Sequence, residues 1–241
     1  MQNGIRDEVV KNKKSTTLNS GFNTSVFENR HEILEFQHRM HPDISRFSKV
    51  NFYHGSALKD PQNMEQKRDW NCNIWKSRSI WIDVQNQKDS RSFNSREVSF
   101  VIKNLRNFMA WTEKNPHGKK QDENIWSVAI LTYYRKQERE IKASVTELFG
   151  AKRERSYYKD GNRNIEVKVF TVDKFQGQEA DVVFISLVKS GNAPLGFMDS
   201  PNRLNVALTR AKYQRIIFGS RVYFSQKGGS LLKILERSMD K

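Results

Sequence analysis

The sequence predicts an α/β fold in which a parallel β-sheet is flanked by helices. Short apolar runs alternate with longer amphipathic stretches along most of the chain, which is the pattern of strand–helix–strand units. The run at 127–132 is apolar without alternation, as expected of a strand that helices cover on both faces. A chain of 241 residues can bury such a core in one domain, or at most two.

The elements are predicted in a regular order. Pro42 suits the first turn of a helix, because its missing N–H has no partner there, and apolar residues at helical spacing continue to Tyr53, before Gly55. Further helices are predicted over 98–111, 135–149, 204–211 and 230–237. Strands are predicted over 79–84, 127–132, 167–172, 182–188 and 215–218. The basic, polar stretch 151–164 is expected to be a loop or an exposed hairpin.

Both the N-terminal segment and the cysteine content limit the class of protein. Residues 1–22 are polar and lack periodicity, so we expect a remnant or disordered segment there and a single lobe over 23–241. That segment has no apolar stretch and is not a signal peptide, and no run of about 18 apolar residues exists for a membrane span. Cys72 is the only cysteine, which excludes a disulfide framework. A cytoplasmic protein is expected, or a nuclear one in a eukaryote.

The net charge points to a polyanionic partner. The chain has 42 Lys and Arg against 27 Asp and Glu, a formal charge of +15. Such an excess attracts nucleic acid, and phosphate contacts would make that binding weaken with salt. A well-solvated basic surface without a partner is the alternative.

Three polar segments lie where an α/β sheet places ligands, at strand ends. They are QHRMHP at 37–42, TVDKFQGQEAD at 171–181 and PNRLNVALTRAK at 201–212. Arg39 and Arg210 offer permanently charged, planar forks that suit phosphate oxygens, and Gly177 permits a close backbone approach. Taken singly, each arginine is more often a solvated surface charge. His38 and His41 lack further ligands at zinc spacing, so no metal site is expected.

Taken together, these segments resemble the motifs of superfamily 1 helicases of the RNA-surveillance, Sen1 and Dna2 group. The first resembles Q-[YH]-R-M-H-P, the second T-V-D-x-F-Q-G-x-E-x-D-x-V and the third R-x-N-V-A-x-T-R-A. LTYYRKQ at 131–137 is similar to a fourth motif, T-P-Y-x-x-Q, with Tyr133 where proline is usual. The four occur in the family's order and cover most of the chain, which makes the resemblance specific. It implies a RecA-like second lobe, a P-loop NTPase-type fold that lacks the P-loop.

The resemblance also implies a role for each motif residue. Arg39 and Arg210 would act on the γ-phosphate of ATP as catalytic residues, with Arg210 a candidate arginine finger. Gln176, Gly177 and Glu179 would lie on the nucleotide side of the cleft between the two lobes, where ATP binds. Gln176 would couple the bound nucleotide to the bound nucleic acid. Thr132, Thr171 and Ser186 would contact the backbone of single-stranded DNA or RNA.

The parts of an ATP site that hold phosphate and magnesium are missing from the sequence. No G-x-x-x-x-G-K-[ST] loop occurs, and no Asp-Glu pair follows an apolar strand. ATP and Mg²⁺ are therefore expected only in a complex with a P-loop lobe, in the same full-length protein or a separate chain. The chain is expected to begin just after the family's G-D-x-x-Q-L motif, as a fragment or split-gene product, and to be inactive alone.

Two functions from different classes follow from this pattern. In the first, the chain is half of a helicase and completes a composite ATP site. In the second, it is a stand-alone nucleic-acid-binding or regulatory module without ATPase activity. The presence of Arg39, Glu179 and Arg210 favours the first, because a pure binding module does not need them. A nuclease gains little support, because no carboxylate cluster on matched strand ends is evident.

Overall fold

The computed structural model describes residues 35–53, 58–85, 90–117, 125–226 and 231–239, apart from the side chain of Phe197. The expected polar N-terminal segment and the expected helix end at Gly55 lie outside the described residues. Among the described residues, no helix is long and apolar enough to cross a membrane.

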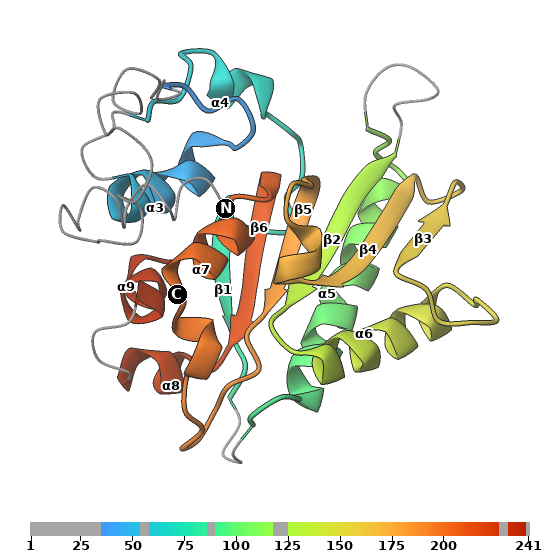
Figure 1. The fold of residues 1–241 in the computed structure, drawn as a ribbon. Coiled ribbons are helices and arrows are strands. Elements are labelled where there is room, and N and C mark those ends of the chain that lie inside the picture. Colours follow the sequence, from blue (N-terminus) through green and yellow to red (C-terminus); the bar gives the residue numbers. More distant parts are fainter. Residues whose placement is uncertain (1–34, 54–57, 86–89, 118–124, 227–230, 240–241) are drawn as a thin grey trace, which may run out of the picture.

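A six-stranded sheet forms the centre of the molecule, in the order β1-β6-β5-β2-β4-β3 (Figure 1). Its strands are β1 (Ser79–Asp83), β2 (Trp126–Thr132), β3 (Tyr157–Asp160), β4 (Ile165–Thr171), β5 (Ala180–Ser186) and β6 (Ala211–Gly219). Every neighbouring pair is parallel except β3 and β4, which form an antiparallel hairpin at one edge. The predicted helix-flanked, mainly parallel sheet is confirmed, and the basic 151–164 stretch supplies the first strand and the turn of the hairpin.

Helices cover the sheet on both sides. One side carries α5 (Ser95–Thr112) and α6 (Arg135–Leu148), and the other carries α3 (Pro42–Phe52), α7 (Pro201–Leu208), α8 (Arg221–Gln226), α9 (Leu231–Ser238) and the 3₁₀ turns η2 (Val172–Phe175) and η3 (Gly196–Asp199). A short helix, α4 (Met64–Lys67), joins α3 to β1. Each side has its own apolar cluster, so β5 is buried along its whole length between the two.

Local sequence explains where the helices next to the site begin. Pro42 is in the first turn of α3, and the imidazole of His41 accepts a hydrogen bond from the backbone N–H of Asp43. Asn94 caps α5 in the same way by accepting from the N–H of Glu97 at 3.2 Å.

The boundary between α7 and β6 differs from the prediction. The helix ends at Leu208, and the strand already begins at Ala211, which pairs with Ala180 of β5. Leu208, Arg210 and Ala211 are good helix formers and no glycine stop follows Leu208, so helix propensity predicted a longer helix. Arg210 therefore lies in a tight turn between helix and strand, and the N–H of Ala180 donates to its carbonyl at 3.0 Å.

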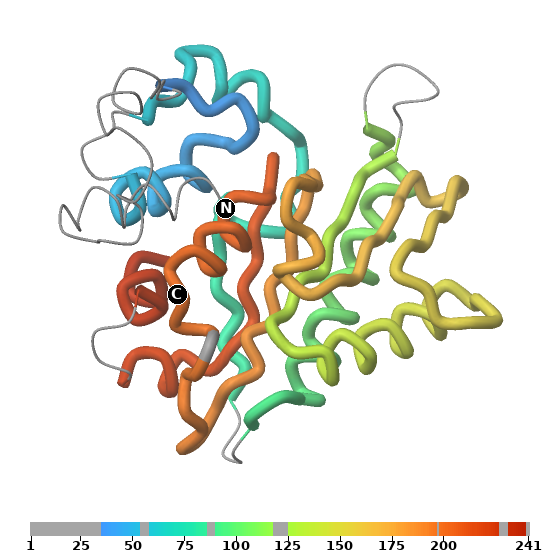
Figure 2. The backbone as a smooth tube through the Cα atoms, viewed as in Figure 1, coloured from blue at the N-terminus to red at the C-terminus, as the bar shows by residue number. Residues whose placement is uncertain are grey.

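Segments distant in sequence meet beside this turn. The blue segment that enters α3 lies beside the orange segment of α7 and β6 (Figure 2). The N–H of His41 donates to the carbonyl of Lys212 at 2.9 Å, which fixes the two segments together.

Candidate functional site

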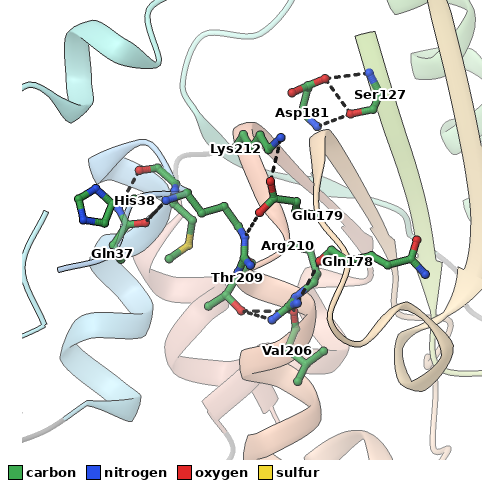
Figure 3. Close-up of polar contacts among 12 residues, drawn as sticks. Gln37, His38, Ser127, Gln178, Glu179, Asp181, Val206, Thr209, Arg210 and Lys212 are labelled. Atoms are coloured by element: carbon green, nitrogen blue, oxygen red, sulfur yellow. Dashed lines mark hydrogen bonds and ion pairs between the residues drawn. The ribbon is translucent and has the colours of Figure 1, made fainter. Parts of the chain in front are cut away.

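An arginine, a glutamate and a lysine from three segments meet where β5 and β6 begin. Nε of Arg39 donates to Oε2 of Glu179 at 2.6 Å, and Nζ of Lys212 lies 2.9 Å from Oε1 of the same carboxylate. Figure 3 shows Glu179, Lys212, Thr209 and Arg210 gathered at this edge. The side chains of Arg39 and Glu179 keep 31% and 41% of their surface exposed, so an incoming anion can reach them.

Arg210 lies beside this group but is held by the protein backbone. Its guanidinium donates to the carbonyl of Val206 at 2.9 Å and to that of Gln178 at 3.0 Å, and reaches the Thr209 hydroxyl at 3.3 Å (Figure 3). These bonds fix the plane of the guanidinium. Arg39 also donates to the Thr209 carbonyl at 3.1 Å, so both arginines are positioned from the same turn.

The charges of the cluster act on one another. Burial favours the neutral carboxyl of Glu179, but the hydrogen bonds from Arg39 and Lys212 outweigh it and hold its pKa below the usual range. Burial, and then repulsion from Arg39, lower the pKa of Arg210. Two guanidinium groups are thus brought together with one carboxylate, an arrangement that a further anion would stabilise.

The loop that carries Arg39 is shaped by Gln37. Its Oε1 accepts from the N–H groups of Arg39 at 3.0 Å and Met40 at 2.7 Å, and its Nε2 donates to Asp60 at 2.6 Å. Arg68 adds a bond from its Nε to the Arg39 carbonyl at 2.7 Å. The glutamine of the QHRMHP motif therefore positions Arg39 through the backbone.

The loop before β5 is open to solvent. Gln176, Gly177, Gln178 and Glu179 are all exposed, and Gly177 has φ +85°. This is the left-handed region that glycine adopts without steric cost. Asp181, two residues beyond Glu179, has a structural role, because its Oδ2 accepts from the N–H of Ser127 at 2.9 Å and from its hydroxyl at 2.7 Å.

The expected nucleic-acid contacts lie at the opposite ends of the strands, where the strands finish. Thr132, Thr171 and Ser186 are the last residues of β2, β4 and β5, and both Thr171 and Ser186 pair with Thr132 in register. Glu179 and Arg210 instead precede the first residues of β5 and β6. The motifs therefore divide between the amino-terminal and the carboxyl-terminal ends of the strands. The sequence predicted only that all of them lie at strand ends.

These three residues are buried to different degrees. Thr132 and Ser186 are fully buried, whereas Thr171 keeps 8% of its surface exposed. The Ser186 hydroxyl donates to Glu97 at 2.6 Å and accepts from Nε2 of Gln137 at 2.9 Å, so it is committed to an internal network. The side chains of Thr132 and Ser186 are therefore not exposed in this conformation, and a nucleic-acid contact through them stays a prediction.

Sequence reasoning missed the centre of that network. Glu97 is fully buried, and it accepts from the N–H of Val188 at 2.9 Å as well as from Ser186. Burial raises its pKa to about 8. The available signal was Asn94 three residues before Glu97, a helix-cap pattern. Among the described residues, no group of His, Cys, Asp and Glu has the arrangement of a metal site.

A mostly parallel sheet, covered on both faces and carrying the helicase motifs at its two edges, defines a RecA-like helicase lobe. The chain belongs to the AAA_12 family, an AAA domain, which matches residues 15–222. Its motifs and its relatives place it with superfamily 1 helicases of the Sen1 and RNA-surveillance group.

Relatives in other organisms contain a similar segment within much longer proteins. Helicase sen1 of Schizosaccharomyces pombe is 32% identical over 224 residues, which are 88% of this chain and 12% of the relative. A "Regulator of nonsense transcripts 1 homolog" of Neurospora crassa is 31% identical over 88% of this chain and 19% of its own length. Among solved structures, the C-terminal domain of a possible DNA helicase from Lactobacillus plantarum gives a TM-score of 0.40 at 14% identity, over 76% of this chain and 88% of that one. The chain spans less than a quarter of either curated relative.

Proposed function

We propose that this chain is the second RecA-like lobe of an ATP-dependent helicase and completes an ATP site whose phosphate-binding loop lies on another lobe. That lobe belongs either to the same full-length protein or to a partner chain. The observation that carries the proposal is the pair of arginines at the amino-terminal ends of β5 and β6, with Arg39 partly exposed beside Glu179 and Arg210 half-buried and held by the Gln178 carbonyl.

The donor set fits a phosphate group. A guanidinium has five N–H donors, and within the described chain Arg39 uses two of them, for Glu179 and the Thr209 carbonyl. The remaining donors of Arg39 and Arg210 are available for phosphate oxygens. Bound ATP with Mg²⁺ supplies the transferable γ-phosphoryl group, and the two arginines would orient it and neutralise the charge that develops on it.

Other motif residues take supporting roles in this proposal. Gln176, Gly177 and Glu179 would line the nucleotide side of the cleft between the two lobes. Gln176 would link the bound nucleotide to the bound nucleic-acid strand. Glu179 holds Arg39 while the cleft is open, and a phosphate would compete for that arginine on closure. At the opposite edge, Thr171 is the threonine that we propose contacts the single-stranded DNA or RNA backbone.

The test combines the purified chain with a P-loop lobe of a related helicase and measures ATP turnover with and without single-stranded RNA or DNA. Arg210→Ala and Arg39→Ala should each lower turnover by about 10³-fold or more, the size of an arginine-finger effect. Arg46→Ala is the matched control, because that side chain is 77% exposed and pairs with Asp43 on α3.

Two results would contradict the proposal. Turnover unaffected by both substitutions would mean that the arginines do not face the phosphate. If the wild-type chain gives no stimulated turnover but binds nucleic acid, the chain is a binding module.

A further inference from the structure

On the hairpin half of the sheet, α6 covers one face, while the main contact of β4 on the other face is the 3₁₀ turn η2. Along β4, Ile165, Val167 and Val169 are buried towards α5 and α6, while the alternating residues are half-buried. Across the hairpin, Tyr157 is directly opposite Lys168, and Lys159 is directly opposite Glu166. Directly opposite residues share a face of the sheet. The other side, which we term the open face, comprises Tyr157, Lys159, Glu166, Lys168 and Phe170, the last half-buried against the apolar cluster on the α3 and α7 side.

Tyr157 is an exposed ring with a fixed position. Its side chain is 44% exposed although it lies on a strand, so it contributes little to the core. Its hydroxyl donates to Oε2 of Glu166 at 3.0 Å, which anchors one end of the ring. Phe170 lies further along the same face, packed against Phe175 with ring centroids 6.1 Å apart. The open face therefore offers an aromatic surface whose geometry is set before any ligand arrives.

The surroundings of this ring are basic. Lys159 is exposed and forms no ion pair with any residue that the structure describes, while Lys168 lies 3.2 Å from Glu166. Lys142 of α6 lies 5.8 Å from the ring centroid of Phe170, but its Nζ is paired with Glu138 at 2.7 Å. The loop that enters β3 adds the exposed cations Lys152, Arg153 and Arg155 and one exposed acid, Glu154. Glu166 is the acidic exception on this face.

We propose that the open face binds single-stranded nucleic acid, with a base stacked on Tyr157 and phosphates held by Lys159 and Lys168. Exposed aromatic rings on a sheet, flanked by cations, are a general means of binding unpaired bases, because every base has a flat apolar face. The bases of a duplex are already stacked on one another and are not available to Tyr157. The open face should therefore bind single-stranded nucleic acid in preference to a duplex. The inference rests on the proposed strand-binding function and adds a surface that none of the helicase motifs contains.

The experiment measures binding of the full chain to a fluorescent oligouridylate of about 15 nucleotides and to an abasic oligonucleotide of equal length, across a salt series. Tyr157→Ala should weaken oligouridylate binding by about 5- to 20-fold, as expected for loss of one stacked base, without weakening abasic binding. Tyr157→Phe should retain wild-type affinity, because the ring remains. Lys159→Gln with Lys168→Gln should weaken both oligonucleotides and reduce the salt slope by about 1.4.

The controls carry the same changes on the far side of the sheet. Phe100→Ala removes a ring that is 38% exposed on α5, and Lys103→Gln with Lys114→Gln removes two exposed charges on and just after that helix. These variants should bind nearly as the wild type does, and circular dichroism should show that all variants fold.

Three outcomes would overturn the proposal. If the wild type binds in a salt-sensitive way and the hairpin variants match the controls, the open face is not the site, although strand binding stands. If the wild type does not bind even at low salt, the open-face proposal and the proposed nucleic-acid contact of Thr171 both fail, while the ATP-site proposal is judged by its own turnover test. If the lysine variants aggregate at unchanged affinity, these lysines serve only to protect a sheet edge from pairing.

Discussion

At the residue scale, the buried carboxyl group of Glu97 holds the chain at the carboxyl-terminal end of β5. It accepts from the backbone of Val188, whose φ of +75° is unusual for a β-branched residue. Such a backbone costs about 1–3 kcal/mol and persists only where its surroundings hold it. The network of Glu97, Ser186, Gln137 and Asn94 provides that hold, so it determines the path of the chain leaving β5.

Glu97 should make stability fall as pH rises. Its pKa is about 8 in the folded protein and near 4.5 when unfolded, so between these values the folded state holds one more proton. The free energy of unfolding should then fall with pH in this window by up to about 1.4 kcal/mol per unit. Urea unfolding at several pH values should show this slope in the wild type and a flatter one in Glu97→Gln. Parallel slopes in the two proteins would contradict the assignment.

At the element scale, the crossover from β4 to β5 depends on its glycine. Residues 172–179 run by way of η2 from the end of β4 to the beginning of β5, which lies on the other side of β2 in the sheet. Gly177 has φ +85°, and a Cβ added there would meet nothing within 4 Å. Any effect of a substitution therefore comes from the backbone conformation and not from a clash.

Gly177→Ala should destabilise the protein by about 1–2 kcal/mol, the cost of a left-handed conformation for an L-residue. Gly161→Ala is the matched control, because Gly161 also has open space around it but lacks a left-handed φ. That substitution should be neutral or stabilising by up to about 1 kcal/mol. Thermal unfolding of the three proteins gives the comparison, and equal losses in both variants would show that the φ of Gly177 does not matter.

Elements with a regular hydrophobic pattern were predictable, and those set by tertiary contacts were not. The strands β1, β2 and β5 and the helices α5 and α6 follow directly from periodicity. The short helices α4 and α8 carry too few residues to show a period. The sequence also could not show that α7 ends at Leu208, since the strand pairing of Ala211 with Ala180 overrides helix propensity there.

Prediction of the candidate site had a similar limit. Arg39, Glu179 and Arg210 were identified by motif. The contact between Arg39 and Glu179 joins residues 140 positions apart, so it depends on the fold and could not be predicted from the sequence. The family resemblance implied that Ser186 contacts nucleic acid, yet its hydroxyl is bonded to Glu97 of α5 and Gln137 of α6, and no motif connects those two helices. Arg215 illustrates the same difficulty, because this charged residue is 1% exposed and bonds Ser79, Ile44 and Leu208 inside the protein.

At the scale of the whole molecule, charge and catalytic competence are separate properties. The formal charge of +15 gives the chain an attraction for polyanions that does not depend on ATP. The two arginines at the amino-terminal edge add nothing to hydrolysis unless a phosphate-binding loop faces them. The chain should therefore bind single-stranded nucleic acid without hydrolysing nucleotide.

The isolated 241-residue chain should show no ATP hydrolysis above buffer, because its sequence contains no G-x-x-x-x-G-K-[ST] loop. It should nevertheless bind single-stranded oligonucleotide, with affinity falling about 10-fold or more between 50 and 200 mM salt, since several phosphates are neutralised at once. Both are measured on one preparation, by phosphate release and by fluorescence anisotropy, and Arg210→Ala should change neither. Nucleic-acid-stimulated hydrolysis by the chain alone, abolished in Arg210→Ala, would instead mean that it forms a complete ATP site from its own residues.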